Sequence, residues 1–254
     1  MSRLWGLAIN TFREAVRDRV LYSILFFGVG VIFLSLALEE VTIGDQEKVV
    51  RSVGQAAIDA FGSIIAMFLG VSLVWKELDK KTIYTILSKP IPRWMFVVGK
   101  YLGLMLTLVV EIAILLSIYC GLMVIEQSFP PPVVFVSMAL LLAELMLLTA
   151  WATLFSCYSA PMTASAFTLA IFCIGHLADD VLLFGSQSDS AAYRQLSQVL
   201  YWVLPNFEIF NIREHAVHEL PIPWERVWPA LAYSLSYTTA VLGAAVAIFQ
   251  RRDL

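Results

Sequence analysis

Six long apolar stretches, separated by polar segments, dominate the pattern of hydrophobic and polar positions along the 254-residue chain. A helix needs about 20 mostly apolar residues to cross the roughly 30 Å of hydrocarbon in a bilayer, and each stretch is close to that length or longer. The stretches cover residues 20–38, 57–75, 101–125, 133–157, 162–183 and 227–249. The pattern therefore predicts an all-α, polytopic membrane protein with six transmembrane helices.

Composition supports this fold class. Hydrophobic residues make up 59% of the chain and charged residues only 15%, with a mean hydropathy of +0.79. Ordinary soluble domains are about one quarter charged. A soluble fold of this size could not bury so much apolar surface, so lipid must be the solvent for much of it. The spans and their links use most of the chain, so we expect one transmembrane domain, residues 1–254, without a separate soluble domain.

Lys and Arg residues are distributed unevenly about the spans. Twelve of the 17 flank one side: four before the first span, six in the loop after the second, and two in the C-terminal tail. Loops rich in Lys and Arg stay in the cytoplasm. We therefore expect both termini and the loop after the second span to be cytoplasmic, as in a multi-pass protein of the cell's inner (cytoplasmic) membrane.

Two segments outside the spans also show helical spacing. In residues 1–19, apolar positions and charges recur on opposite faces, which predicts an amphipathic helix lying in the cytoplasmic headgroup plane. The alternative is a simple extension of the first span. In the long outer loop, residues 184–228, apolar positions from Leu196 to Leu204 predict a short helix ending at Pro205.

The loop at residues 76–93 carries the densest positive charge. Its first half combines a polar face, which includes Glu77 and Lys80, with an apolar ridge of Ile83, Ile86 and Leu87, before prolines stop the helix. A ridge of that kind suits docking into a groove on a partner protein. Packing against the inner face of the membrane is the alternative.

The order of motifs along the chain resembles that of the permease subunits of ABC-2 type transporters. The motifs are Glu77-x-Asp79-x-Lys81-Thr82-Ile83, Leu87-Ser88-x-Pro90-Ile91-x-Arg93, Phe96-x-x-Gly99-Lys100-x-x-Gly103, and an N-terminal Asn10-Thr11-Phe12-Arg13-Glu14. The resemblance implies that residues 1–19 form an elbow helix, that residues 76–93 form a coupling helix seated on an ATPase, and that re-entrant helices precede the sixth span. It assigns ATPase coupling to Glu77, Asp79, Lys80, Lys81, Thr82, Ile83, Ile86, Leu87, Pro90 and Arg93.

The chain has no Gly-x-x-x-x-Gly-Lys-Ser/Thr phosphate loop. We therefore expect a permease that is not itself an enzyme and binds no cofactor, with ATP and Mg²⁺ held by a separate ABC ATPase subunit. The resemblance implies an exporter that pairs with a second copy or a related permease in the lipid bilayer, without nucleic acid. A proton-coupled secondary transporter and a non-transporting membrane scaffold for an ATPase are the alternatives. The substrate is not indicated.

Five polar residues within or near the spans are candidate intramembrane sites. Glu111 and Glu144 lie near the middle of the third and fourth spans, where a carboxylate costs at least ~2.5 kcal/mol unless protein or water surrounds it. Each is either a substrate or proton contact or, as we favour, a hydrogen-bonded packing residue. His176, Asp179 and Asp180 end the fifth span, and we interpret them as a polar cap at the interface rather than as a metal site.

Small residues recur at four-residue spacing in two places. Gly62, Ala66 and Gly70 lie in the second span, and Gly99 and Gly103 enter the third. Such spacing lets two helices approach closely. The close contact is formed either within one chain or between two copies.

Overall fold

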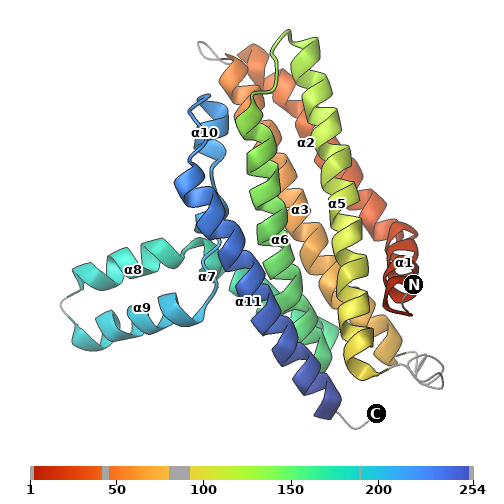
Figure 1. Ribbon diagram of the computed structural model, residues 1–254. Helices are drawn as coiled ribbons and strands as arrows, with labels where there is room; N and C mark the ends of the chain where they lie inside the picture. The colour runs from red at the N-terminus through yellow and green to blue at the C-terminus, as the bar shows by residue number, and fades with distance from the viewer. Residues whose placement is uncertain (1–2, 42–45, 80–91, 189, 252–254) are drawn as a thin grey trace.

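The structure is a computed structural model that describes residues 3–41, 46–79, 92–188 and 190–251 (Figure 1). Its elements are, in chain order, α1 (Arg3–Val16), α2 (Arg19–Val41), α3 (Gln46–Asp79), α5 (Arg93–Ile125), α6 (Pro132–Tyr158), α7 (Pro161–His176), α8 (Ala178–Gln187), α9 (Ala191–Val203), the 3₁₀ turn η1 (Glu208–Phe210), α10 (Arg213–Val217) and α11 (Trp224–Arg251). The described residues contain no strand, so the predicted all-α class is confirmed.

Among the described residues, five single helices are long and apolar enough to cross a membrane, α2, α3, α5, α6 and α11, and the bent pair of α7 and α8 passes the same test together. The five single helices contain the predicted first, second, third, fourth and sixth spans. The second is longer than predicted, because α3 begins at Gln46 and continues unbroken to Asp79. At 1.5 Å per residue this helix is about 50 Å long, so it extends well beyond the hydrocarbon at one end or both.

The predicted fifth span, residues 162–183, is not one straight helix. Here α7 ends at His176, α8 begins at Ala178, and the two helices are bent by 60°. The two helices together remain apolar enough for a span, although His176, Asp179 and Asp180 lie at the bend, so hydropathy alone does not reveal the break. Backbone packing holds the bend in place: the Phe207 N–H donates to the Gly175 carbonyl at 3.0 Å, and a methyl group on Gly175 would overlap the Phe207 ring.

After the bend, α8 and α9 form a hairpin that extends sideways from the bundle (Figure 1). The predicted helix ending before Pro205 is confirmed as α9, which ends at Val203. The chain then returns to the end of α7 and continues along α3 and α6. We call residues 204–219, which include η1 and α10, the return segment.

The two ends of the bundle can be told apart by which elements meet there. At the lower end of Figure 1, α3 and α11 end and α5 begins. At the upper end, α2 and α5 end, α6 begins, and α10 packs against α3 and α6. The return segment runs from the middle of the bundle toward the upper end.

The N-terminal helix α1 lies along the first turns of α5. Methyl groups added to Gly99 and Gly103 would contact Leu7 and Thr11, so successive turns of the two helices meet in parallel. The Lys100 Nζ, fully buried, lies 3.3 Å from the Glu14 Oε2. The prediction of a helix within residues 1–19 is confirmed, whereas its position in the headgroup plane stays a prediction.

The small residues of α3 serve contacts inside the chain. A methyl group on Gly62 would press against Ile112 of α5, and one on Gly70 would overlap the side chain of Ala152 on α6. The Ser156 hydroxyl of α6 donates to the Gly70 carbonyl at 3.1 Å. Of the two alternatives for these residues, the structure therefore selects packing within one chain.

Gly70→Ala should destabilise the fold, whereas Gly121→Ala should not. The added methyl at Gly70 overlaps α6, and overpacking of this kind costs about 1–3 kcal/mol. At Gly121 the methyl would meet nothing within 4 Å, and alanine favours a helix interior by roughly 0.5–1 kcal/mol. Thermal unfolding of both variants in detergent measures the difference, and an equal shift in the midpoints would contradict the close α3–α6 contact.

Candidate functional site

Most of the predicted ATPase-coupling residues lie outside the described residues. The backbone of Glu77 and Asp79 is in the last turn of α3, and residues 80–91, which include Lys80 to Pro90, are not described. Arg93 is the first residue of α5, and its Nη1 donates to the Gln250 carbonyl at the end of α11, 3.0 Å away. The loop therefore joins two long helices at the lower end, beside the end of a third.

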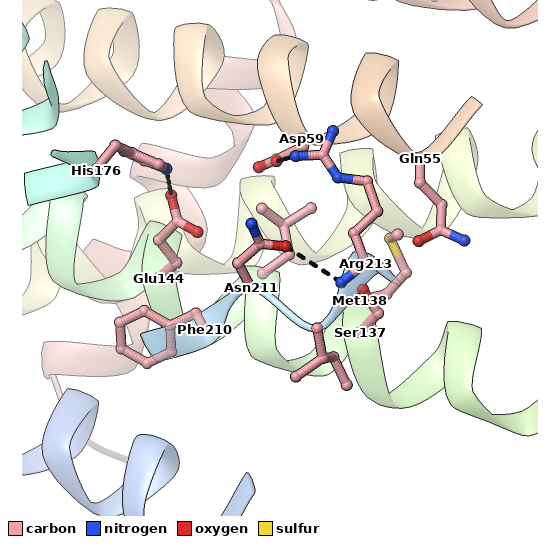
Figure 2. A pocket seen from close by; sticks show the side chains of 11 residues that line it. Gln55, Asp59, Ser137, Met138, Glu144, His176, Phe210, Asn211 and Arg213 are labelled. Carbon is pink, nitrogen blue, oxygen red and sulfur yellow. Dashed lines mark hydrogen bonds and ion pairs between the residues drawn. The ribbon is translucent and has the colours of Figure 1, made fainter. Parts of the chain in front are cut away.

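A polar pocket of about 40 Å³ lies between α3, α6, the end of α7 and the return segment (Figure 2). The residues that line it are Gln55, Asp59, Ser137, Met138, Leu141, Glu144, His176, Phe210, Asn211, Ile212 and Arg213. A water molecule needs roughly 10–15 Å³ of such space and two to four polar partners. The pocket therefore has room for about two or three waters and side chains that would hold them.

At its deeper end the pocket holds a contact between a histidine and a carboxylate, which joins the bend to α6. The His176 Nε2 lies 3.3 Å from the Glu144 Oε1, and the ring's other nitrogen, Nδ1, is 3.0 Å from the Phe172 carbonyl (Figure 2). Glu144 is almost fully buried and lies at the middle of α6, whereas His176 is the last residue of α7. The pair thus ties the broken span to the neighbouring helix near the centre of the bundle.

Nearer the upper end, an ion pair ties the return segment to α3. The Arg213 Nη2 lies 3.5 Å from the Asp59 Oδ2, and both side chains are about one third exposed. The Arg213 backbone N–H donates to the Asn211 Oδ1 at 3.2 Å, which fixes the start of α10 (Figure 2). Because both charges stay partly exposed, this pair can open without placing an isolated charge in an apolar interior.

The amide of Gln55 lies one helical turn from Asp59 on α3. Its Nε2 donates to the Tyr119 hydroxyl at 3.5 Å, whereas the buried Oε1 has no hydrogen-bond partner within the part of the chain described. Figure 2 shows this oxygen on the pocket side of the amide, near Met138. A buried acceptor without a partner costs about 1–3 kcal/mol, so a donor in the pocket would stabilise this arrangement.

A third polar cluster lies above the pocket, one further turn along α3. Arg51, which is almost fully buried, forms ion pairs with Glu47 and Glu219 at 2.5 Å each and hydrogen-bonds the Ser128 hydroxyl at 3.0 Å. Ser128 also donates to Glu47. Arg51 therefore joins α3, the turn between α5 and α6, and the end of the return segment.

The structure separates the predicted intramembrane residues. Glu144 and His176 line the pocket, whereas Glu111 is buried elsewhere on α5, and neither of its carboxylate oxygens has a hydrogen-bond partner in the described chain. Asp179 accepts a hydrogen bond from the Asn206 amide at 2.8 Å, and Asp180 is exposed. Grouping His176 with both aspartates as one polar cap is therefore incomplete, because the histidine faces Glu144 instead.

Sequence reasoning did not single out four residues of these clusters: Arg51, Gln55, Asp59 and Arg213. Three of them lie at four-residue spacing, which places them on one face of α3. A polar stripe on the outer half of an otherwise apolar span was the signal that could have been used. The partner Arg213 follows in sequence only after 153 further positions, so it could be found only from the fold.

Chemically, the pocket offers carboxylate and amide oxygens, one imidazole and one guanidinium around a small hydrated space. It could exchange protons or hold a small cationic group. Among the described residues, no group of three or more His, Cys, Asp and Glu side chains is arranged to hold a metal ion.

Comparison with known proteins identifies a family. A family model described as "ABC-2 family transporter protein" matches residues 5–254, almost the whole chain. No curated protein matches the chain.

Proposed function

Because the chain belongs to the ABC-2 family of transporter proteins, we propose that it is the transmembrane permease subunit of an ATP-driven exporter. Two copies, or one copy and a related permease, form the translocation path in the inner membrane. Each engages a separate ABC ATPase, which binds ATP and Mg²⁺, through the loop at residues 76–93. The lower end of the bundle, with both termini, faces the cytoplasm, and the upper end faces outside.

The family match over residues 5–254 is the observation that carries this proposal. The matched residues contain no phosphate loop. Binding and hydrolysis of ATP are therefore assigned to a separate ABC ATPase subunit. The concentration of Lys and Arg at the lower end supports its cytoplasmic orientation.

The long helix α3 offers a physical route from the ATPase to the pocket. Its lower end continues into the coupling loop, and its upper half carries Gln55 and Asp59 of the pocket wall. A continuous helix transmits axial shifts and tilts as a rigid body more readily than a broken one. Movement of the loop on ATP binding would therefore shift the α3 wall of the pocket relative to the return segment.

A proton-coupled secondary transporter is the second candidate, and the Glu144–His176 pair favours it. Both side chains can exchange a proton, and they meet near the middle of the bundle. In this case transport would follow the proton gradient and would not need an ATPase.

Reconstitution distinguishes the two functions. We expect the chain, co-expressed with an ABC ATPase encoded beside it, to purify as a stable complex whose ATPase activity changes on insertion into liposomes. Liposomes that hold the chain alone should keep an imposed pH gradient, followed with a fluorescent pH indicator, as long as empty liposomes do. Failure to bind the ATPase, together with rapid collapse of the gradient, would contradict the exporter and support the proton-coupled transporter.

A further inference from the structure

The return segment is unusual because its backbone is irregular yet lies inside the bundle. Phe207, Phe210 and Ile212 are each 2% exposed or less, although the only regular structure from Leu204 to Ile212 is one 3₁₀ turn. At membrane depth, irregular backbone is tolerated only where protein buries it or where it lines a water-filled cavity. The return segment meets both conditions, since its other side lines the polar pocket.

Hydrogen bonds fix the lower half of the return segment to its neighbours. The Asn206 N–H donates to the Tyr233 hydroxyl at 3.1 Å, and the Phe207 N–H donates to the Gly175 carbonyl at 3.0 Å. Tyr233 belongs to α11 and Gly175 to α7, so main-chain N–H groups of this half are held from both sides, by a side-chain hydroxyl and by a main-chain carbonyl. The lower half of the segment is therefore a fixed base.

The upper half, which includes Arg213 and Glu219, makes two ion pairs to a single face of α3, beside the packing of α10, whose Ala216 and Val217 are buried, against α3 and α6. Arg51 pairs with Glu219, and Asp59 pairs with Arg213. On each element a positive charge therefore faces a negative charge on the other. The two α3 residues are eight positions apart, about 12 Å along the helix. Opening both side-chain pairs and separating α10 from α3 would therefore move the upper half without breaking the hydrogen bonds of the base.

We propose that the upper half of the return segment is the outer gate of the translocation path, and that the pocket behind it binds a cationic group. In the closed state the cationic group in the pocket is the guanidinium of Arg213, a residue of the return segment itself. A substrate group with a positive charge and hydrogen-bond donors displaces it from Asp59 and leaves between α3 and the segment. This inference rests on the proposed function, because a gate is needed only if the chain forms a path.

The chemistry of the pocket selects the cation. Without Arg213, the remaining polar groups are mainly acceptors: the carboxylates of Asp59 and Glu144 and the unpartnered Oε1 of Gln55. The His176 ring is already directed toward Glu144, at 3.3 Å, and does not point its Nε2 at Asp59. A guanidinium or ammonium group supplies the donors that these acceptors need, whereas an anion would face two carboxylates.

The gate is tested by cysteine labelling from the outside. Ser137 lines the pocket on α6 and is nearly buried, so Ser137→Cys is a small change whose thiol the closed gate should protect. The assay uses full-length chain in liposomes, with Cys120, Cys157 and Cys173 replaced by Ala, and a membrane-impermeant maleimide. Adding Asp59→Arg or Arg213→Asp should speed labelling up to about fivefold, because each variant breaks one partly exposed pair, which contributes up to ~1 kcal/mol.

The double variant Asp59→Arg/Arg213→Asp restores opposite charges and should return the rate toward that of the parent. Arg194→Asp is the matched control, because it makes the same change of charge away from the gate. Arg194 lies on α9, where its guanidinium donates to the Ser188 carbonyl. Size-exclusion chromatography shows whether Asp59→Arg folds. If it does not, Asp59→Asn replaces it and should open the gate to a smaller extent. Equal labelling in the parent and in all gate variants would overturn the gate.

The cation site is tested by chemical rescue. In Arg213→Ala, added guanidinium chloride should slow labelling of Ser137→Cys toward the parental rate, whereas sodium chloride at the same ionic strength should not. An equal effect of both salts would overturn the cation site. Labelling needs neither ATPase nor transport. A labelling result that overturns the gate or the cation site therefore leaves the proposed function standing. Failure to bind the ATPase would, in turn, leave the labelling result intact.

Discussion

Replacing Glu77 and Asp79 together by lysine should abolish co-purification of the chain with its ABC ATPase. The two carboxylates belong to the loop whose motif resembles the coupling segment of the family, and α3 carries them to the lower end of the bundle. Truncating one partner of a hydrogen-bonded charge pair at an interface costs about 2–5 kcal/mol, and reversal adds repulsion. Two reversals should therefore weaken binding by at least about 100-fold.

The matched control makes the same change of charge at the opposite end. Glu126 follows α5 and Glu225 begins α11, both at the upper end, so Glu126→Lys/Glu225→Lys should leave ATPase binding unchanged. Pull-down and ATPase stimulation in liposomes measure both variants. Retained binding with normal stimulation in the Glu77→Lys/Asp79→Lys variant would show that the coupling segment is assigned to the wrong loop.

Lys100→Glu should cause the largest loss of folding stability among the substitutions considered, about 3–5 kcal/mol, the cost of leaving a buried charge without its counter-ion. The Lys100 Nζ is buried 3.3 Å from Glu14, and it also lies 6.0 Å from the centre of the Phe96 ring. A carboxylate at this position would face both a like charge and the negative face of an aromatic ring. The contact between α1 and α5 should open first.

Two further variants separate charge from packing at this position. Lys100→Met keeps the apolar stem, and Glu14 is 38% exposed and can stay hydrated, so stability should change by no more than about 1 kcal/mol. The exchange Glu14→Lys/Lys100→Glu should recover part of the loss. Unfolding midpoints in detergent measure all three, and a Lys100→Met variant as unstable as Lys100→Glu would contradict the electrostatic explanation.

The family match confirms the resemblance noted in the sequence, and the long apolar helices of the structure confirm most of the predicted spans. These features depend on the short-range pattern of apolar residues, which reports burial in lipid directly. The break after His176 is different. Residues 162–183 are mostly apolar, with His176, Asp179 and Asp180 beside the bend, and the bend depends on the return of Phe207 to Gly175, a contact across 32 positions of the chain.

The candidate site shows the same division. Glu144 and His176 stand out in the sequence because polar residues are costly in a span, yet their pairing joins α6 to the end of α7. Asp59 was visible at the edge of its span, whereas Arg213 was only one of the few outer basic residues. Neither position indicates the other, since ion-pair partners are chosen by proximity in space.

The sequence by itself determined the membrane class, the number and place of most spans, and the loop expected to meet an ATPase. Local hydropathy, charge and proline positions carry that information, because the bilayer and the backbone geometry act on each segment independently of the rest of the chain. Only the tertiary structure decided that the fifth span breaks and that small residues of α3 pack within the chain. It also decided that four separate segments enclose one polar pocket, because these features arise from contacts between distant residues.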